Sequence, residues 1–445
     1  MTAHVRPYLN ALVILAIIVG WTVGPHADET APIVVMISID GMRPASYLEA
    51  GPARIPTLRR LARDGAWAEG VTGVLPTVTY PSHTTMITGV QPARHGITGN
   101  TILDPEGLSR GAWYWYARQI QVPTLPGAVR ARGLTAAAVS WPVTVGMDLD
   151  YLVPEFPRSG HPESLHMLAA LSRPDTLFAG YEREAGTPGW PLTDADRAGM
   201  AAWILRTFRP NLMLVHIFDN DSASHASGPA SPEALAALEE SDAQVARILD
   251  AARQAGLADR LTVVIASDHG FITLEHRLQL NAAFRERGLL DLDDEGRITG
   301  WRAYFKPAGG SAEVHLSPDA SPEVRTQVEA LLAQMARDPA NGIDRVWTPE
   351  ELAEVGAYPD AAFAITMRPG FYTGGAHDRL LVPLTGGGGH GFDPTFPEMK
   401  ASLIMHGPDV NRSGSLGQVR MSQIAPTIAR WFGVQLAPDA DEPLW

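Results

Sequence analysis

The chain has 445 residues and a formal net charge of −14 at pH 7, with 45% hydrophobic and 19% charged residues. This is the composition of a globular protein, and its excess of acid argues against binding of nucleic-acid polymers, which relies on clustered Lys and Arg. There is no cysteine, which excludes disulfides, thiol nucleophiles, iron–sulfur clusters and cysteine-based zinc sites. Any tight metal site must therefore use histidine and carboxylate ligands.

Residues 1–27 are predicted to be a signal peptide or an N-terminal anchor. They contain the apolar run ALVILAIIVGWTV at 11–23, which is shorter than the roughly 20 residues that a membrane-spanning helix needs. The tripeptide Pro25-His26-Ala27 lacks a small residue at its first position, so cleavage and anchoring both stay open. We expect export to the periplasm or the extracellular space, with no membrane span in the mature chain.

Apolar runs of strand length alternate with segments that have Pro near the start or Gly at the end. Pro and Gly at these positions are typical of the start and the end of a helix. In chain order these patterns predict a strand at 33–39, helices at 56–65, 81–89 and 123–132, a strand at 135–142, a helix at 194–209, a strand at 211–218, a helix at 231–255 and a strand at 261–267. Such alternation is typical of an α/β fold with a mostly parallel sheet.

The pattern changes over residues 297–355, where short strands surround a helix at 321–337. This change predicts an inserted α+β subdomain at about 290–357. Residues 361–367 and 401–407 are predicted to be the last strands of the main sheet. We therefore predict a three-layer α/β/α sandwich with a mixed, mostly parallel central sheet and a small inserted subdomain.

Three of the predicted strands end at acidic residues. Asp40 follows the first, Asp219 and Asp221 follow NLMLVHIF, and Asp268 follows LTVVIAS. Buried parallel strands appear as continuous apolar runs, and open α/β sheets bind ligands beyond the carboxyl ends of their strands. The three strand ends therefore predict a divalent-metal site at one edge of the sheet.

Histidines close to these acids can supply nitrogen ligands. His225 follows Asp221 by four residues, and His269 directly follows Asp268. A spacing of four residues lets two side chains converge across one turn, which favours Asp221 over Asp219 as the partner of His225.

Catalytic zinc usually has three protein ligands and one open position, so Asp221 and His225 need a third ligand. His390 in GGGGHG is a good candidate, because flanking glycines let the backbone approach a metal closely, and His377 in GGAHDRL is the alternative. The remaining candidates would form a second site: Asp40, Asp268 and His269. Two metal ions roughly 4 Å apart can bind the attacking and leaving oxygens of an in-line phosphoryl displacement.

The segment LPTVTYPSHTTMITG supplies a candidate nucleophile, Thr79, at a loop-to-helix junction. The start of a helix stabilises a phosphoryl anion through free N–H groups and the helix dipole. A threonine hydroxyl is a weak nucleophile until its proton is removed, which metal coordination achieves. The structural alternative is that Thr79 only caps the helix.

Taken together, the motifs resemble those of the nucleotide pyrophosphatase/phosphodiesterase family, also called type I phosphodiesterases, of the alkaline phosphatase superfamily. The matching segments, from residue 33 to about 393, are SIDGMR, PTVTYPSHTTMITG, HGITGN, DSASH, SDHG and GGHGFD. The resemblance implies an alkaline phosphatase-like catalytic domain over 30–445. It also implies a hydrolase that cleaves phosphodiester or pyrophosphate bonds in a small molecule or nucleotide.

The resemblance further implies two divalent metal ions, expected to be Zn²⁺, and a covalent phosphothreonine intermediate. Thr79 would be the nucleophile, Asn100 would hold a phosphoryl oxygen, and Tyr80 would pack on the base of a substrate. The implied metal ligands are Asp40, Thr79, Asp221, His225, Asp268, His269 and His390.

Two alternatives stay open from the sequence. The first is a phosphomonoesterase or phosphonate hydrolase on the same scaffold. The second is a metal-dependent binding protein that has the metal ligands but no catalytic activity. His216 stands five residues before Asp221, where the family often has a tyrosine, so a preference for nucleotides is left open.

Overall fold

The computed structural model describes residues 31–49, 51–109, 112–156, 161 and 163–445. The predicted signal peptide or anchor at 1–27 lies outside the described residues. Within them, no helix is long and apolar enough to cross a membrane.

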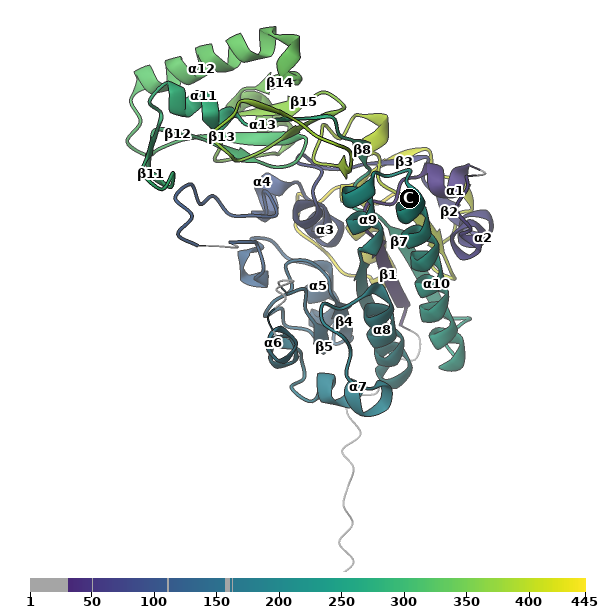
Figure 1. Cartoon of the computed structure of the whole chain (residues 1–445). Helices are drawn as coiled ribbons and strands as arrows, with labels where there is room; N and C mark the ends of the chain where they lie inside the picture. Colours follow the sequence, from purple (N-terminus) through teal and green to yellow (C-terminus); the bar gives the residue numbers. More distant parts are fainter. Residues whose placement is uncertain (1–30, 50, 110–111, 157–160, 162) are drawn as a thin grey trace, which may run out of the picture.

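An eight-stranded mixed sheet forms the centre of the fold (Figure 1), in the order β20-β2-β19-β7-β1-β6-β4-β5. Its strands are β1 (Ile33–Ile39), β2 (Ala66–Trp67), β4 (Ala136–Val139), β5 (Tyr151–Val153), β6 (Leu212–Ile217), β7 (Leu261–Ala266), β19 (Leu403–His406) and β20 (Gly414–Ser415). The strands from β7 to β5 run parallel, whereas β19 is antiparallel to β7 and β2. This mixed, mostly parallel sheet confirms the predicted fold class.

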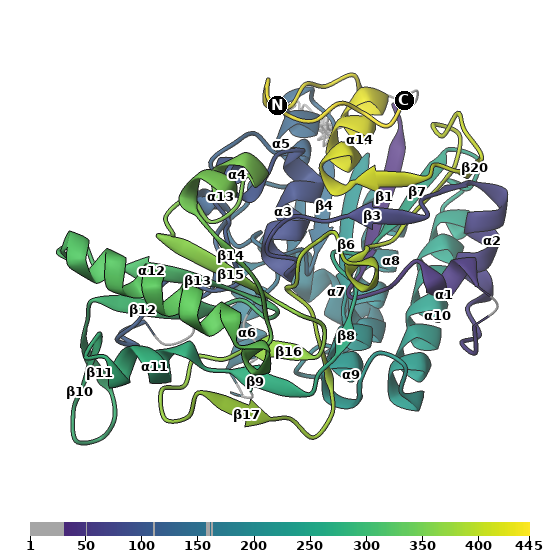
Figure 2. The same ribbon diagram turned by 90° about the horizontal axis from the view of Figure 1, so that it is seen from above.

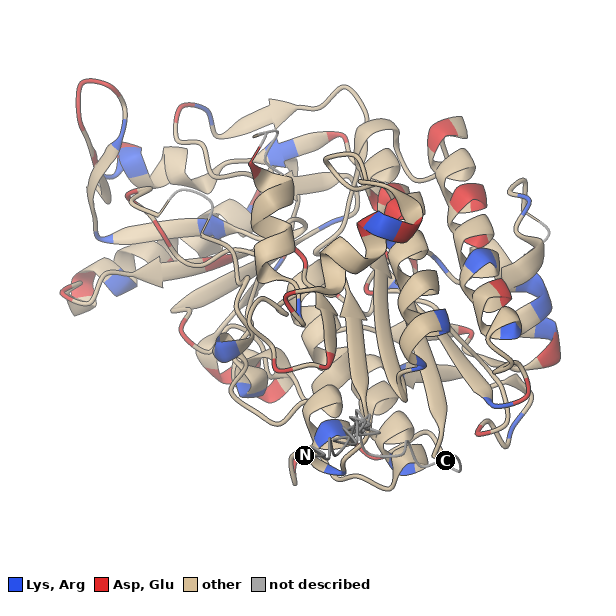
Figure 3. Ribbon diagram, turned by 90° about the horizontal axis from the view of Figure 1, so that it is seen from below, with Lys and Arg blue, Asp and Glu red and all other residues tan. Residues whose placement is uncertain are grey.

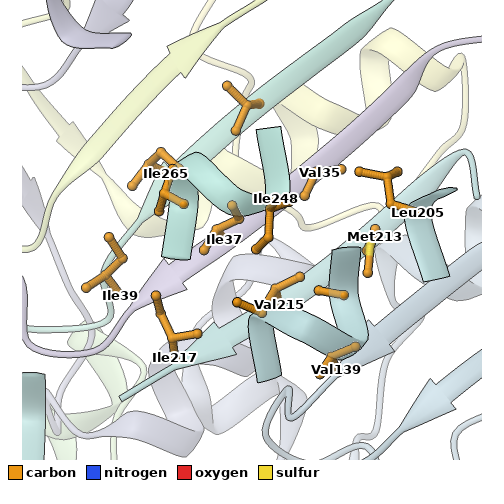
Figure 4. Close-up of a cluster of buried hydrophobic side chains, with 14 of the residues drawn as sticks. Val35, Ile37, Ile39, Val139, Leu205, Met213, Val215, Ile217, Ile248 and Ile265 are labelled. Atoms are coloured by element: carbon orange, nitrogen blue, oxygen red, sulfur yellow. The ribbon is translucent and has the colours of Figure 1, made fainter. Parts of the chain in front are cut away.

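Helices cover both faces of the sheet, because successive residues of a strand point to opposite sides. In β1, Val35, Ile37 and Ile39 pack with one helical layer (Figure 4), and Val34 and Met36 pack with the other. Full burial of each such side chain contributes about 1.5–3 kcal/mol. The first layer holds α2 (Pro56–Asp64), α8 (Asp194–Phe208) and α10 (Pro232–Gln254), and the second holds α3 (Thr79–Thr88), α5 (Leu125–Ala131) and α14 (Ile424–Phe432).

The long helix α10 starts where its sequence predicts. Ser231 Oγ accepts the N–H of Ala234 at 3.1 Å, and Pro232 fills the first position, whose N–H would have no helical partner. Helix α8 starts with the reciprocal pair Thr193 and Asp196, each side chain accepting the backbone N–H of the other.

A second, antiparallel sheet in the order β12-β13-β15-β14 lies beside the main sheet (Figures 1 and 2). Its elements are β12 (Ala303–Pro307), β13 (Ser311–Leu316), α12 (Pro322–Arg337), β14 (Ile343–Trp347) and β15 (Phe363–Met367). The prediction that 361–367 is a strand of the main sheet is therefore wrong. The short run FAITM is buried throughout, so no period in its sequence reveals which strands it pairs with.

Shorter elements connect these layers. The helices among them are α1 (Ala45–Leu48), α4 (Pro92–His95), α6 (Ser164–Leu171), α7 (Leu177–Ala185), α11 (Leu280–Glu286) and α13 (Pro349–Val355). The strands among them are β3 (Gly70–Thr72), β8 (Ile272–Thr273), β9 (His276–Leu278), β10 (Leu290–Leu292), β11 (Ile298–Trp301), β16 (Phe371–Thr373), β17 (Leu381–Pro383) and β21 (Gln418–Arg420).

Charged residues of both signs are spread along the described part of the chain. Figure 3 shows Lys and Arg interspersed with Asp and Glu on the ribbon. Lys306 is a buried charged residue. It lies in the antiparallel sheet β12-β13-β15-β14, called the small sheet below, and pairs there with Glu313.

Candidate active site

The carboxyl ends of β6, β1 and β7 lie side by side, because the three strands pair in parallel with Ile39 level with Ile217. Asp40 directly follows β1, and Asp268 comes two residues after β7. The helix α9 (Asp219–Ser227) starts shortly after β6. The acid-bearing strand ends therefore meet at one edge of the sheet, as their sequences predicted.

The first cluster at this edge, the Asp40 group, consists of Asp40, Asp268 and His269. His269 Nε2 lies 3.3 Å from Asp40 Oδ1 and 3.1 Å from Asp268 Oδ2. These three atoms have no hydrogen-bond partner among the described residues, although each residue is at most 2% exposed. Because bare polar atoms in a protein interior are costly, their convergence fits a bound cation.

The charges of the Asp40 group also favour a cation. Burial and the carboxylates of Asp268 and Asp221 raise the pKa of Asp40 well above its usual value, and burial raises the pKa of Asp268. Burial lowers the pKa of His269 to about 3, so its imidazole is neutral and offers a lone pair. A divalent cation would favour the ionised carboxylates and reverse their shifts.

The second cluster, the Asp221 group, consists of Asp221, His225 and His390. Asp221 and His225 are one turn apart on α9, which puts them on the same face of the helix. Asp221 Oδ1 lies 3.3 Å from His225 Nε2 and 3.8 Å from His390 Nε2. The ligand atoms of each group lie within 4.8 Å of one another, so both groups have the size and ligand types of a divalent-metal site.

Backbone carbonyls orient both imidazoles of the Asp221 group. His225 Nδ1 lies 2.9 Å from the carbonyl oxygen of Gly388, and His390 Nδ1 lies 3.0 Å from that of Thr77. A carbonyl oxygen only accepts hydrogen bonds, so each Nδ1 donates to it and Nε2 is the ring nitrogen that faces the group. The two Nε2 atoms are 3.1 Å apart, so a single cation could bind both.

The glycines before His390 allow the two segments to approach. A Cβ at Gly387 would lie 2.6 Å from the carbonyl oxygen of His225, and one at Gly388 would lie 2.8 Å from that of Ser224. The strand β18 (Gly388–Gly389) can therefore lie against α9 only without side chains. The alternative ligand His377 belongs to neither group.

The start of α3 lies between the two groups. Thr77 accepts the hydrogen bond from His390, and His83, one turn into α3, has its Nδ1 3.8 Å from Asp268 Oδ2. Thr79 is the first residue of α3 and is partly exposed there. The free N–H groups of a helix start favour an anion at this position.

The side chain of Asn100 is oriented by α3. Its Oδ1 accepts the backbone N–H of Tyr80 at 2.9 Å, which leaves the amide NH₂ to donate elsewhere. The ring of Tyr80 is fully buried, with its hydroxyl 3.1 Å from Glu155 Oε1 and Trp113 packed edge-on against it. That Tyr80 packs on a substrate base therefore stays a prediction.

The sequence model of type I phosphodiesterase/nucleotide pyrophosphatase matches residues 34–393, a range that includes both ligand groups and α3. The chain belongs to this family. The match confirms the family that the motifs indicated.

Curated members of the type I phosphodiesterase family are similar to this chain. Ectonucleotide pyrophosphatase/phosphodiesterase family member 3 of Mus musculus is 26% identical over 251 residues, which are 54% of this chain and 25% of the relative. Venom phosphodiesterase 2 of Crotalus adamanteus is 25% identical over 262 residues, which are 56% of this chain and 28% of the relative. The matched part thus spans about a quarter of the length of these relatives.

Solved structures of family members have a similar fold. Human ectonucleotide pyrophosphatase/phosphodiesterase 5 has a TM-score of 0.66 at 20% identity, covering 93% of this chain and 98% of that chain. An inactive variant of the murine protein in complex with AMP has a TM-score of 0.64 at 19% identity over the same shares. At these identities the likeness shows the fold, which agrees with the predicted alkaline phosphatase-like architecture.

His216 has a place in the site that the sequence did not predict. Its Nε2 lies 3.0 Å from Asp40 Oδ2, and its Nδ1 lies 3.6 Å from Glu155 Oε2. Burial lowers the pKa of His216, but the bonds to Asp40 and Glu155 outweigh burial and raise it to about 10. The signal in the sequence was an ionisable residue inside the apolar strand LMLVHI.

Proposed function

We propose that this protein is a metal-dependent hydrolase that cleaves phosphodiester or pyrophosphate bonds with Thr79 as the nucleophile. The observation that carries the proposal is the contact between the two ligand groups. The rings of His269 and His390 stack with centroids 3.5 Å apart, beside the start of α3. Two adjoining cation sites and one hydroxyl are the components of in-line phosphoryl transfer.

Two divalent metal ions, expected to be Zn²⁺, would occupy the two groups, with Thr79 as a further ligand in the Asp40 group. Mixed histidine and carboxylate ligands suit zinc. Bound there, the ions would lower the pKa of the Thr79 hydroxyl and neutralise charge on the phosphoryl oxygens.

Thr79 carries the covalent chemistry. Its deprotonated Oγ attacks phosphorus in line, an Oγ–P bond forms, and the bond between phosphorus and the leaving oxygen breaks. The proton that leaves Oγ passes to water, and water gives a proton to the leaving oxygen. A water molecule then attacks phosphorus of the phosphothreonine, the P–Oγ bond breaks, and one proton of that water restores the threonine hydroxyl.

Asn100 and the start of α3 would stabilise the charge that develops on the phosphoryl group. The Asn100 amide, oriented by the N–H of Tyr80, would donate to a non-bridging oxygen together with the backbone N–H of Thr79. One such preorganised donor is worth about 3–4 kcal/mol in the transition state.

A phosphomonoesterase or phosphonate hydrolase is the alternative on the same scaffold. Such enzymes often place basic side chains over the phosphoryl group. The segment after Asn100 offers Arg110, which lies outside the described residues, and Arg118, whose guanidinium lies 4.6 Å over the ring of Tyr116. This arrangement favours diesters over monoesters.

Hydrolysis rates on a nitrophenyl phosphodiester and the matching nitrophenyl monoester test the proposal. We expect faster cleavage of the diester, whereas faster cleavage of the monoester would favour the alternative. A non-catalytic binding protein would cleave neither compound while still binding metal.

The proposed substrate is a small phosphodiester or nucleotide, and the proposed location is the periplasm or the extracellular space. The apolar run at 11–23 supports export, and a venom phosphodiesterase is among the relatives. Cell fractionation tests this location, since recovery of the protein from the cytoplasm would contradict it.

A further inference from the structure

We propose that the hairpin between β12 and β13 is a positioning element for the metal site. It holds the backbone of His390 so that the imidazole reaches the Asp221 group. The hairpin belongs to the small sheet and not to the strands that carry the acids. The inference rests on the proposed function, because it concerns a metal ion of that same site.

The turn of the hairpin packs directly on His390. The N–H of Gly310 donates to the carbonyl oxygen of His390 at 2.8 Å. A Cβ at Gly309 would overlap the same oxygen, and a Cβ at Gly391 would overlap the carbonyl oxygen of Ala308. The two segments therefore lie so close that neither can carry a side chain at the contact.

The turn is itself held by the small sheet and its neighbours. The N–H of Thr373 donates to the carbonyl oxygen of Gly309 at 2.9 Å, and the hydroxyl of Thr373 lies 2.7 Å from that oxygen and 2.9 Å from the carbonyl oxygen of Ser311. The N–H of Met367 in β15 donates to the carbonyl oxygen of Gly310 at 2.8 Å. The position of His390 is thus set by a folded unit and not by the glycine run alone.

The same hairpin reaches the other side of the site. Lys306 in β12 is 5% exposed and pairs with Glu313 across the hairpin. Its Nζ lies 3.2 Å from the Cβ position of Gly99, the residue before Asn100. One hairpin thus contacts the segment of His390 and the segment of Asn100. Its displacement would therefore move both of these residues.

The test compares Gly309→Ala with Gly296→Ala. Both glycines have φ of +78°, so alanine is equally strained at both positions, but a Cβ at Gly296 meets nothing within 4 Å. Zinc-loaded protein is dialysed against increasing chelator, zinc per chain is measured by mass spectrometry of the metal, and circular dichroism monitors the fold.

We expect Gly309→Ala to release one zinc ion at an about 10–100-fold lower chelator concentration than the wild type. Metal affinity usually falls by this factor when a residue that holds a metal ligand in place is lost. Gly296→Ala should follow the wild type. Identical chelator dependence of the three proteins would overturn the proposal.

Thr373→Val is the second variant if Gly309→Ala does not fold. It removes the hydroxyl that holds Gly309 while keeping the shape of the side chain. We expect the same zinc ion to leave at lower chelator than in the wild type, and an unchanged dependence would overturn the proposal. Substitution with Co²⁺ adds a spectroscopic readout, because displacement of one imidazole changes the visible bands of one of the two ions.

These readouts are separate from turnover. Wild-type protein that binds zinc but cleaves no diester would overturn the proposed function, while the zinc titrations would still decide the role of the hairpin. Wild-type protein that binds no zinc would overturn both.

Discussion

The imidazole rings of His269 and His390 stack with centroids 3.5 Å apart and an angle of 8° between their planes. They belong to different ligand groups, so the stack sets the spacing between the two proposed metal ions. Each ring directs Nε2 toward its own group, while Nδ1 lies near a backbone carbonyl. Loss of His390 should therefore remove a ligand of the Asp221 group and one side of this stack.

His390→Ala should lower the zinc content from two ions toward one per chain and slow diester hydrolysis by about 100-fold or more. Loss of a direct metal ligand should reduce activity at least as much as loss of a residue that only holds the ligand in place. Metal analysis and initial rates measure both effects. His377→Ala is the matched control, since this histidine belongs to neither group. Equal losses in the two variants would contradict the assignment.

His216 should act as a positioning residue for Asp40. Its bond to Asp40 Oδ2, at 3.0 Å, leaves Oδ1 directed toward His269. We expect His216→Leu to weaken zinc binding in the Asp40 group by about 10–100-fold, and His216→Gln to restore part of it through an amide donor. Chelator titration of both variants is the measurement, and a His216→Leu variant with wild-type zinc affinity would refute this role.

His95 should make the stability of the fold depend on pH. It is buried with Nδ1 accepting the N–H of Ile97 and Nε2 3.1 Å from Thr85 Oγ1, and burial lowers its pKa to about 3. Between about pH 6.5 and 3 the unfolded chain binds a proton at His95 that the folded chain does not, so stability falls as pH falls through this window.

Between pH 7.5 and 5.5 the contribution of His95 should amount to about 1.4 kcal/mol. The free energy of unfolding in urea is measured for the wild type and His95→Asn at both pH values and at constant free zinc. The difference between the two proteins gives the contribution of His95. The variant keeps an acceptor for Ile97 but has no titrating ring, so it should lose less stability on acidification. The same loss in both proteins would exclude this effect.

The sequence predicted the acid-bearing strand ends because parallel strands deliver their carboxyl ends to a common edge, a local rule that needs no tertiary information. It predicted His390 because glycines reveal a close approach of the backbone. It could not assign FAITM to the small sheet, since only strand pairing decides between two buried sheets.

The surroundings of two side chains at the site could not be predicted from the sequence either. The burial of the Tyr80 ring depends on Trp113, which comes from a distant part of the sequence. The role of His216 depends on Asp40, which lies in the neighbouring strand end. Neither partner is visible from the local pattern of residues.

The turnover of a nitrophenyl phosphodiester by Thr79→Ala, compared with the wild type, shows directly whether Thr79 is the nucleophile. We expect a folded variant that keeps both zinc ions and turns over at least about 1,000-fold more slowly than the wild type, because the attacking hydroxyl is gone. Thr79→Ser should retain part of the rate, since it keeps a hydroxyl. A Thr79→Ala variant with the turnover of the wild type would exclude Thr79 as the nucleophile.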